Sequence, residues 1–309
     1  MPKLVLTVGL PGCGKSTWAT EEVKKSKRKT VILNRDDIRE TMFGGNWEYR
    51  YSNENEKYVQ NTLAFQAQEA VKNGWDIIVA NTNLNPKEQN MWSTFAKENS
   101  YTLVHQDFFK EFKKGKSFVH DYFAINAFVK HCKERNLKRL KSVQESVIDQ
   151  MATSYYYSTV TPPPVIEGDG LKYYIVDIDG TLAHMLDYRS PYDETKVHLD
   201  VPDEFVISVL HALVKDPSVR IILMSGRHVT CKELTQEWLA THSVPYHELH
   251  MRAADDVRGD DVVKYELYMQ EVYNKNKRVQ VVFDDRQKVV NTWRELLGLK
   301  TFQVQPGNF

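Results

Sequence analysis

The residues Leu4-Val-Leu-Thr-Val-Gly-Leu-Pro-Gly-Cys-Gly-Lys-Ser16 decide the fold of the first half of the chain. They place a short apolar strand before the pattern G-x(4)-G-K-[ST], which opens a helix predicted at Lys15–Lys25. Glycines in such a loop let backbone N–H groups converge on phosphate oxygens, and the helix N-terminus adds the positive end of its dipole. The stretch predicts an ATP site in which Lys15 reaches the β- and γ-phosphates and Ser16 ligates Mg²⁺. A glycine turn that binds nothing is the alternative, and the adjoining strand, helix and Lys-Ser pair argue against it.

Outward from this loop, short β-rich runs alternate with longer amphipathic stretches. Strands are predicted at 4–8, 30–33, 75–80 and 101–108, and helices at 15–25, 36–42, 54–73 and 86–99. From about 118 to 151 the pattern becomes helical and basic. Such alternation is typical of βαβ units, in which helices cover both faces of a parallel sheet.

The stretch Tyr173-Tyr-Ile-Val-Asp-Ile-Asp-Gly-Thr-Leu182 gives the strongest signal in the second half. An apolar strand ends in two aspartates two residues apart, so a regular strand would present both carboxylates on one side. Asp177 can attack phosphorus and form an aspartyl-phosphate, while Asp179 can protonate the leaving oxygen and then activate water. Gly180 permits a sharp turn after them. Acidic strand ends are common, so a structural role is the alternative for this piece alone.

Further polar residues follow at the ends of later predicted elements of the second half. Ser225 and Arg227 end a later strand and supply a hydroxyl and a cation for a phosphoryl group. Lys264 opens a long helix one turn after two aspartates. Carboxylates of Asp177 and of the pair at 284–285, with Asp179 beside them, form the expected Mg²⁺ site, because this hard ion favours oxygen ligands.

The second half repeats the α/β alternation after a break. Strands are predicted at 173–177, 219–224, 246–249, 279–283 and 301–304, and helices at 202–215, 230–241, 260–275 and 286–297. The three prolines at 162–164 cannot sit inside a helix or a central strand, so they mark a linker. We therefore expect two α/β domains, each with a parallel sheet: 1–152, a linker at 153–170, and 171–309.

Length and charge agree with two domains. The chain has 309 residues, 41 Lys and Arg, and 41 Asp and Glu. Residues 1–160 hold 24 basic and 18 acidic side chains, a net of +6, and the remainder holds 17 and 23, a net of −6. The 41% apolar content excludes global disorder, and no apolar run is long enough to span a membrane. Three scattered cysteines form no disulfide framework or metal site, which favours a reducing cytoplasm.

Three polar segments of the first half are further candidates. Asp36 follows the second strand, at the edge of the sheet where ligands bind, and can either accept a proton from an attacking hydroxyl or cap a helix. Asn81-Thr-Asn83 ends the third strand at the same edge. Arg135 and Arg139 are four residues apart in the basic stretch, so on a helix they would share a face and could close over a γ-phosphate. A solvated basic helix is the competing interpretation.

The second-half motifs resemble the haloacid dehalogenase superfamily of phosphotransferases. These motifs follow a phosphate-binding-loop kinase along the chain. With that order of domains, the chain resembles the polynucleotide kinase/3′-phosphatase family of bacteriophages over its full length. The resemblance implies that ATP phosphorylates a 5′-OH end, and that a 3′-phosphate is removed and a 2′,3′-cyclic phosphate often opened. It also implies single-stranded or nicked DNA or RNA ends as substrates, a ligase as functional partner, and a homotetramer.

The resemblance assigns roles in each half. In the first half Asp36 is the general base, Arg39 contacts the acceptor phosphate, and Arg135 and Arg139 form a lid, Arg139 being catalytic. The donor-binding residues are Gly9, Gly12, Gly14, Lys15, Ser16 and Thr17. In the second half Asp177 is the nucleophile, Asp179 the acid–base and Lys264 a further catalytic residue. The substrate and metal positions are Arg189, Ser225, Arg227, Arg252, Arg258, Asp260, Asp284 and Asp285.

Two features qualify the resemblance. The family pattern Asp-Thr-Asn is Asn81-Thr82-Asn83 here, so an amide replaces the charge of a carboxylate, and we expect altered metal or acceptor handling. The aromatic and basic segment Phe43–Tyr51 could stack bases or pack in the core. Two other functions stay open: a small-molecule kinase joined to a metabolite phosphatase, and a nucleotide-gated binding protein with an inert second half.

Overall fold

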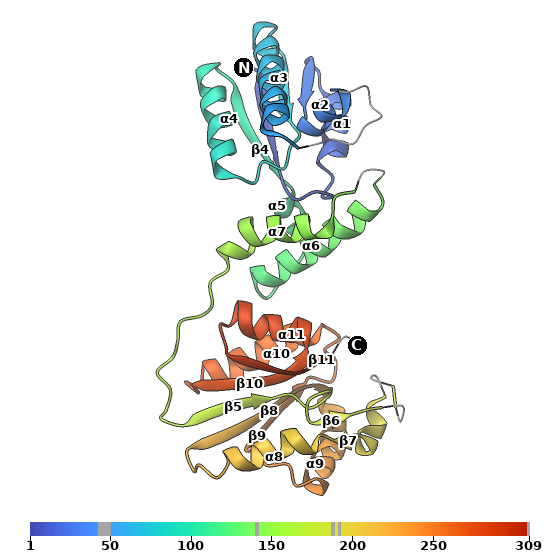
Figure 1. The fold of residues 1–309 in the computed structure, drawn as a ribbon, viewed down its shortest axis with the longest axis vertical. Coiled ribbons are helices and arrows are strands. Elements are labelled where there is room, and N and C mark those ends of the chain that lie inside the picture. The colour runs from blue at the N-terminus through green and yellow to red at the C-terminus, as the bar shows by residue number, and fades with distance from the viewer. Residues whose placement is uncertain (43–50, 140–141, 187–188, 191–192, 308–309) are drawn as a thin grey trace. The chain divides into compact units, whose positions relative to one another are not determined.

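The computed structural model describes residues 1–42, 51–139, 142–186, 189–190 and 193–307, and the chain divides into two compact units, Met1–Val160 and Thr161–Phe309 (Figure 1). The aromatic segment expected at Phe43–Tyr51 lies outside these residues except for its last tyrosine. Every described helix is too short or too polar to cross a membrane.

The first unit is an α/β domain built on a four-stranded parallel sheet with the strand order β2-β3-β1-β4. Its elements are β1 (Lys3–Val8), α1 (Lys15–Lys25), β2 (Thr30–Leu33), α2 (Arg35–Thr41), α3 (Asn53–Lys72), β3 (Asp76–Val79), α4 (Pro86–Glu98), β4 (Thr102–Asp107), α5 (Phe108–Lys113), α6 (Asp121–Leu137), α7 (Glu145–Tyr155) and η1 (Tyr157–Thr159).

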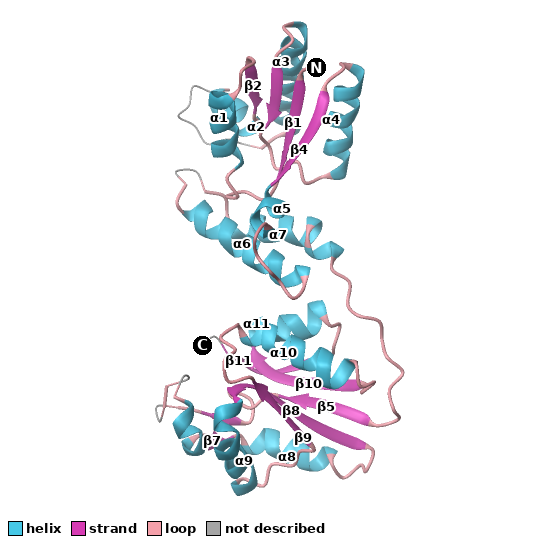
Figure 2. Ribbon diagram, turned by 180° about the vertical axis from the view of Figure 1, so that it is seen from behind, coloured by secondary structure: helices cyan, strands magenta, loops and turns pink. Residues whose placement is uncertain are grey.

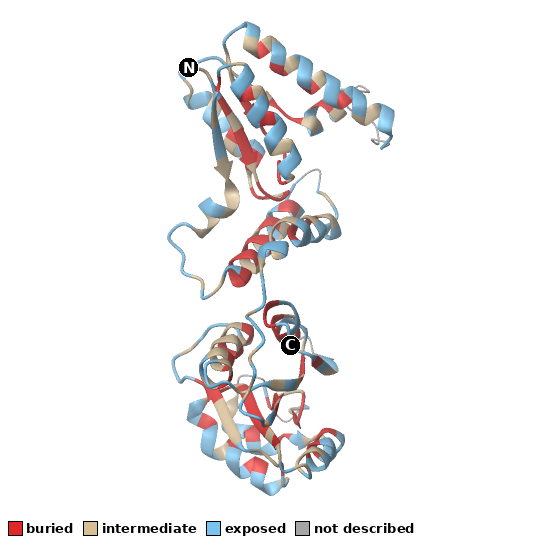
Figure 3. Ribbon diagram, turned by 90° about the vertical axis from the view of Figure 1, so that its left-hand side faces the viewer, coloured by how far each residue is buried: buried red, intermediate tan, exposed pale blue. Residues whose placement is uncertain are grey.

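Alternate residues of the strands build the two sides of this domain, because successive side chains point to opposite faces of a sheet. Leu4 and Leu6 of β1 are fully buried in a cluster with residues of α2, α3 and α4. Ile78 of β3 and Ala19 of α1 belong to the cluster on the other face. Figure 3 shows the buried strands between helices whose outer surfaces are exposed.

The basic stretch of the first unit forms two helices rather than one. Helix α6 ends at Leu137, and Arg139 follows it as a bend in the chain. The expectation that Arg135 and Arg139 share a helix face is therefore wrong. Helix α7 continues to Tyr155, so the first residues of the expected linker are helical. The two helices and α5 pack with the phosphate loop in one cluster, which includes Leu10 and Phe128.

The second unit is also an α/β domain, with a five-stranded parallel sheet in the order β11-β10-β5-β8-β9 (Figure 2). Its elements are β5 (Lys172–Val176), β6 (Ala183–His184), η2 (Glu194–Leu199), β7 (Val201–Pro202), α8 (Glu204–Leu213), β8 (Val219–His228), η3 (Val229–Cys231), α9 (Lys232–Thr241), β9 (Glu248–Arg252), α10 (Asp260–Tyr268), η4 (Met269–Tyr273), β10 (Val279–Arg286), α11 (Gln287–Asn291), η5 (Thr292–Leu296) and β11 (Thr301–Gly307).

Helices cover both faces of this second sheet. Helices α8 and α9 lie on one side, and α10 and α11 on the other (Figures 1 and 2). Leu223 of β8 and Val176 of β5 pack with Leu210 of α8 and Trp238 of α9. Between β5 and α8 the chain forms the antiparallel pair β6-β7 and the short helix η2, which no sequence pattern predicted.

Candidate functional sites

The phosphate loop follows β1, as expected, and holds Lys15 in an inward position. The Lys15 ammonium is buried and donates to the carbonyl oxygens of Gly9 (3.0 Å) and Leu10 (2.7 Å). Burial lowers its pKa, and the nearby charge of Arg139 lowers it further. Ser16 and the following threonine are exposed in the first turn of α1. When a polyanion binds, the Lys15 ammonium would therefore give up its hydrogen bonds to two neutral carbonyl oxygens and pair with the anion.

Helix α6 packs directly on this loop. Gly12 has φ +83°, and a Cβ there would collide with the carbonyl of Cys132 and approach the Asn136 side chain within 3.2 Å. A Cβ on Gly14 would lie 3.2 Å from a guanidinium nitrogen of Arg135. Arg135 therefore reaches the phosphate loop, although both it and Arg139 remain exposed. The structure brings these two arginines and Lys15 to one place.

Asp36 does not cap helix α2. Asn34 is the cap, and its side-chain oxygen accepts the N–H of Asp36 at 2.9 Å. The Asp36 carboxylate is instead 77% exposed and pairs with Arg39 at 2.7 Å. Arg39 also donates twice to Glu56 of α3, at 2.9 and 2.8 Å, which raises the Arg39 pKa. Asp36 is therefore an accessible carboxylate, as a base needs, and its partner arginine is held by a second helix.

Asn81 connects the end of β3 to the first residue of the helix that carries Asp36. Its Oδ1 accepts the N–H of Arg35 at 2.9 Å, and its carbonyl oxygen accepts the hydroxyl of Thr7 at 2.9 Å. Its Nδ2 is buried with no hydrogen-bond partner among the described residues. Because Arg35 is the first residue of α2, Asn81 fixes the start of the helix that carries Asp36. The amide still accepts as a carboxylate would, and it adds an unused donor at the edge of the sheet.

In the second unit, Lys264 joins two of the expected carboxylates. Its ammonium pairs with Asp177 at 2.8 Å and Asp284 at 2.9 Å, and all three side chains are buried. Burial would lower the pKa of Lys264, but the two carboxylates outweigh it and raise the pKa. Burial raises the pKa of Asp177, as do Asp284 and Asp285, while Lys264 opposes them. Asp177, the expected nucleophile, therefore sits in a cluster with an excess of acidic groups.

This cluster is suited to a divalent cation. Asp177, Asp284 and Asp285 each offer an oxygen within 4.8 Å of the others. Both carboxylate oxygens of Asp285 are buried without a partner among the described residues, and burial followed by Asp284 raises its pKa to about 6. Gly180, with φ +79°, is required because a Cβ there would collide with the Asp285 carboxylate. Three converging carboxylates and two unpaired oxygens fit a hard ion such as Mg²⁺.

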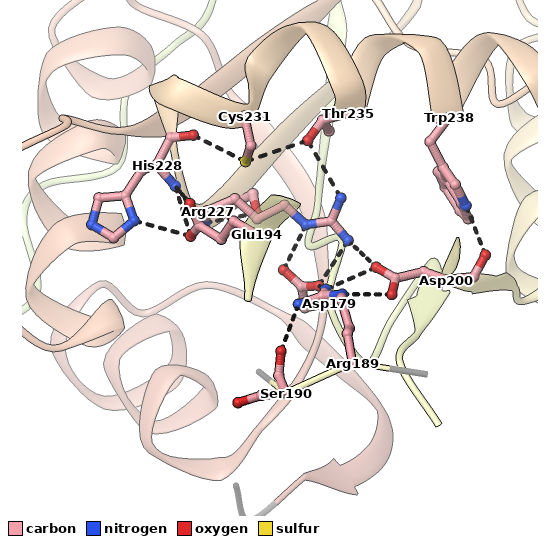
Figure 4. A network of polar contacts seen from close by, with 11 residues as sticks. Asp179, Arg189, Ser190, Glu194, Asp200, Arg227, His228, Cys231, Thr235 and Trp238 are labelled. Carbon is pink, nitrogen blue, oxygen red and sulfur yellow. Dashed lines mark hydrogen bonds and ion pairs between the residues drawn. The ribbon is translucent and has the colours of Figure 1, made fainter. Parts of the chain in front are cut away.

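Asp179, expected beside these ligands, lies instead in an arginine network (Figure 4). Its carboxylate accepts from Arg227 at 2.9 and 2.8 Å and from Arg189 at 2.8 Å. Burial would raise the pKa of Asp179, but Arg227 and then Arg189 outweigh it and hold the pKa below its usual range. Its carboxylate, expected among the metal ligands, lies outside the cluster that Asp177, Asp284 and Asp285 form among the described residues.

Asp200 completes the network, and no sequence motif pointed to it. Its buried carboxylate accepts from Arg189 at 2.7 and 2.8 Å and from Arg227 at 2.7 Å (Figure 4). Its carbonyl oxygen accepts the indole N–H of Trp238 at 2.8 Å. Two arginines thus face two carboxylates, counting Asp179. Asp200 follows η2 in an irregular stretch, so only the contacts of the folded chain identify it.

The remaining candidates lie around the ends of β8 and β9. Ser225 is fully buried, and its hydroxyl accepts the N–H of Arg227 at 3.2 Å. Arg252 donates to backbone oxygens at Gly226 (2.6 Å) and Arg258 (2.5 Å) and pairs with Asp260. The Arg258 side chain is exposed and pairs with nearby acidic residues, Asp256 and Glu266. Arg252 and Arg258 therefore stabilise the loop between β9 and α10 in this structure.

Comparisons with known proteins agree with this division. The family model of an AAA domain matches residues 4–157, and that of the phosphatase domain of polynucleotide kinase PNKP matches residues 171–309. The two matches agree with the resemblance inferred from the sequence: an AAA domain precedes a phosphatase domain of the polynucleotide kinase type.

Similarity also extends along nearly the whole chain. A protein of Autographa californica nuclear polyhedrosis virus, named "Putative bifunctional polynucleotide kinase/RNA ligase", is 29% identical over 324 residues. The match covers 98% of this chain and 42% of that protein, so the chain spans less than half of its relative. Two structures of the Pnkp1/Rnl/Hen1 RNA repair complex contain chains that are 28% identical, with a TM-score of 0.46, covering 100% of this chain and 98% and 97% of theirs.

Proposed function

We propose that this chain, with a kinase domain before a polynucleotide-kinase-type phosphatase domain, is a bifunctional enzyme that heals nucleic-acid ends. The first domain transfers the γ-phosphate of ATP to a 5′-OH, and the second removes a 3′-phosphate. The observation that carries the proposal is the presence of two separate sets of phosphoryl-transfer groups, around Lys15 and around Asp177. The viral relative named a polynucleotide kinase supports nucleic acid as the substrate.

In the first domain the residues divide between donor and acceptor. Lys15, Arg135 and Arg139 supply positive charge at the phosphate loop, where the transferred phosphoryl group carries most of its charge. Asp36 accepts the proton of the attacking 5′-OH, and the new P–O bond forms as the bond to ADP breaks. Arg39, held by Glu56, stays beside Asp36 and receives the acceptor's phosphate.

In the second domain the substrate's phosphate draws Arg189 and Arg227 away from Asp179, which can then take up a proton. The Asp177 oxygen attacks phosphorus, and the P–O3′ bond breaks as Asp179 gives that proton to the leaving oxygen. Water then attacks the aspartyl-phosphate, Asp179 takes its proton, and Asp177 is released with inorganic phosphate. Lys264 keeps Asp177 oriented, while Arg189 and Arg227 attract the phosphate dianion. Mg²⁺ at Asp177, Asp284 and Asp285 would offset the negative charge of the cluster.

The products of the two reactions, a 5′-phosphate and a 3′-OH, are ends that a nucleic-acid ligase can join. The relative's name includes an RNA ligase, which supports a ligase as the enzyme that acts next. We extend the proposal to DNA and RNA alike, because both share this end chemistry.

Matched oligonucleotides test the proposal. DNA and RNA oligomers with 5′-OH and 3′-phosphate ends are incubated with γ-labelled ATP and Mg²⁺, and label uptake and phosphate release are scored separately. We expect both reactions on oligomers, and a catalytic efficiency at least about tenfold lower on free nucleosides and nucleoside 3′-monophosphates, which lack the flanking backbone. Equal or better turnover of the small molecules would favour a metabolite kinase and phosphatase instead.

A further inference from the structure

Asn136 interrupts the apolar stripe of helix α6. Counting back by helical steps, Cys132, Val129, Phe128 and Ile125 are all buried in the cluster under the phosphate loop. Asn136 continues this stripe and is itself fully buried. A buried amide is unfavourable unless it is hydrogen-bonded, so a residue that only filled space here would be apolar. The buried amide therefore indicates that Asn136 makes specific hydrogen bonds.

Both ends of the Asn136 amide bind the backbone of one residue. Its Nδ2 donates to the carbonyl oxygen of Val143 at 2.8 Å, and its Oδ1 accepts the N–H of Val143 at 3.1 Å. This paired contact closes the chain between the end of α6 and the approach to α7. The Asn136 carbonyl oxygen also accepts the N–H of Arg139 at 3.1 Å. Asn136 thus holds the backbone on both sides of Arg139, at the end of α6 and at Val143.

The same residue touches the phosphate loop. The Asn136 Cβ lies 3.2 Å from the position that a Cβ on Gly12 would occupy, next to the carbonyl of Cys132. Arg135, one residue before, places its guanidinium near Gly14. Neither Arg135 nor Arg139 has a carboxylate partner among the described residues, so no ion pair holds them. Their placement depends on the backbone that carries them.

We infer that Asn136 is the positioning residue for Arg135 and Arg139: its paired contact with Val143 holds both guanidinium groups at the phosphate loop. The inference rests on the proposed kinase function and extends it, because it explains how two cations that pair with no carboxylate among the described residues are kept at the ATP phosphates. Asn136 itself contacts no substrate. It acts through the arginines.

Two variants of the whole chain test the role. Asn136→Ala removes both bonds to Val143, and Asn136→Asp keeps the acceptor but loses the donor to the carbonyl. We expect both to weaken ATP binding and to slow the phosphorylation of a 5′-OH end at saturating substrate by about 10–100-fold, as for other supporting contacts of a site. Phosphate release from a 3′-phosphate end should stay unchanged, since it depends on the other unit.

Asn126→Ala is the matched control. Asn126 lies on the same helix and accepts a hydrogen bond from the Tyr157 hydroxyl, so its loss perturbs α6 away from the arginines. We expect less than about threefold change in ATP affinity, because the arginine backbone is left in place. A control that equals Asn136→Ala would mean that general loosening of α6 explains the effect, and the inference would be overturned.

A double-mutant cycle separates positioning from folding. The Kd for ATP with Mg²⁺ is measured for Asn136→Ala in the wild-type chain and in an Arg135→Ala/Arg139→Ala background, with the melting temperature recorded for each. If Asn136 acts through the arginines, the substitution changes Kd by less than about twofold in that background. The same factor in both backgrounds overturns the inference. A wild-type chain that phosphorylates no 5′-OH overturns the proposed function instead.

Discussion

The cations at the phosphate loop and those around Asp179 are held in opposite ways, although Arg39 of the first domain is itself paired with Asp36 and Glu56. In the first domain, Lys15 donates only to backbone oxygens and a thiol sulfur, and no carboxylate among the described residues pairs with Arg135 or Arg139. In the second domain, Arg189 and Arg227 are each paired with two carboxylates. The first site is preorganised by close packing of helix and loop, and the second by ion pairs.

This difference gives the opposed charges of the two halves a physical meaning. At the phosphate loop, Lys15, Arg135 and Arg139 pair with no carboxylate in the part of the chain that the structure describes, so their positive charge is available to the phosphates of ATP. A site of balanced ion pairs needs its substrate to compete with Asp179 and Asp200 for the same guanidinium groups. A cation in the acidic cluster at Asp177 would offset part of the remaining negative charge.

Substituting the two glycines that leave no room for a Cβ, Gly12 and Gly180, should have the largest effect on one activity and not the other. Gly12→Ala forces a collision with Cys132 and should lower 5′ phosphorylation by more than about 10²-fold, because displacements of about 1 Å have that effect on catalysis. Gly180→Ala collides with Asp285 and should do the same to 3′-phosphate release alone. Both activities are assayed in each variant. Gly115→Ala, with φ +72° but open space around it, is the control for backbone strain.

Each glycine variant should spare the other reaction. If Gly12→Ala reduced phosphate release as much as phosphorylation in a folded chain, the two activities would not belong to two separate sites.

Removing one ion-pair partner should have a smaller effect. Asp200→Asn keeps the shape of the side chain but takes one negative charge from the arginine pair, so Arg189 and Arg227 lose one of the two carboxylates that hold both of them. We expect the catalytic efficiency of 3′-phosphate release to fall about 10–100-fold, as for other supporting contacts. Trp238→Phe removes the bond to the Asp200 backbone and part of the core packing but leaves the Asp200 carboxylate in place, so it is the control for lost structure. An Asp200→Asn chain with unchanged efficiency would show that the arginines need no such anchor.

The acidic cluster should make stability depend on pH and metal together. The pKa of Asp285 is raised to about 6 by burial and by Asp284, so folding favours its protonated form. That contribution is present below the unfolded pKa of about 4 and is lost as the pH rises through about 6. Without metal, the second domain should therefore melt roughly 2–6 °C lower at about pH 7.5 than at about pH 5 on account of this group.

Thermal melts of the wild type and Asp285→Asn check the sign. The variant should lose this pH-dependent difference. Mg²⁺ should raise the wild-type melting temperature at neutral pH and have less effect at acidic pH, where the ligands bind protons instead. A pH-dependent difference that persists in Asp285→Asn would assign it to other groups.

The smallest expected difference between the two domains is the effect of salt on their KM values. Raising NaCl from about 50 to about 200 mM should raise the KM for ATP about threefold, because exposed and unpaired cations are screened. The KM for an oligonucleotide with a 3′-phosphate should change less, since Arg189 and Arg227 are buried among their partners. The reverse order would contradict the contrast between unpaired and paired cations.

The sequence predicted the strands and the residues at their ends well. The glycine loop before Ser16 and the aspartates after β5 depend on local patterns, namely apolar runs followed by residues that only a turn accommodates. Both sheets were therefore predicted with their chemistry at one edge. The sequence left open whether Asp36 caps its helix, because Asn34 and Asp36 are equally good capping residues and only the folded backbone shows that Asn34 is the cap.

What the sequence could not predict depends on contacts between distant residues. Asp200 and Asn136 stand in segments with no motif, and their roles follow from partners that folding brings to them. The end of α6 at Leu137 coincides with the contact between Asn136 and Val143 and with no helix-breaking residue. Asp179 was assigned to the metal because its spacing fits, whereas two arginines from other segments hold its carboxylate.

The most direct test of the central claim uses one oligonucleotide with a 5′-OH and a 3′-phosphate, and two variants of the whole chain. Lys15→Ala removes the phosphate-loop cation, and Asp177→Asn removes the proposed nucleophile; both activities are measured with ATP and Mg²⁺. The account predicts that Lys15→Ala abolishes 5′ phosphorylation and leaves 3′-phosphate release intact, and that Asp177→Asn does the reverse. Loss of both activities in either variant, with the fold preserved, would contradict two independent sites in one chain.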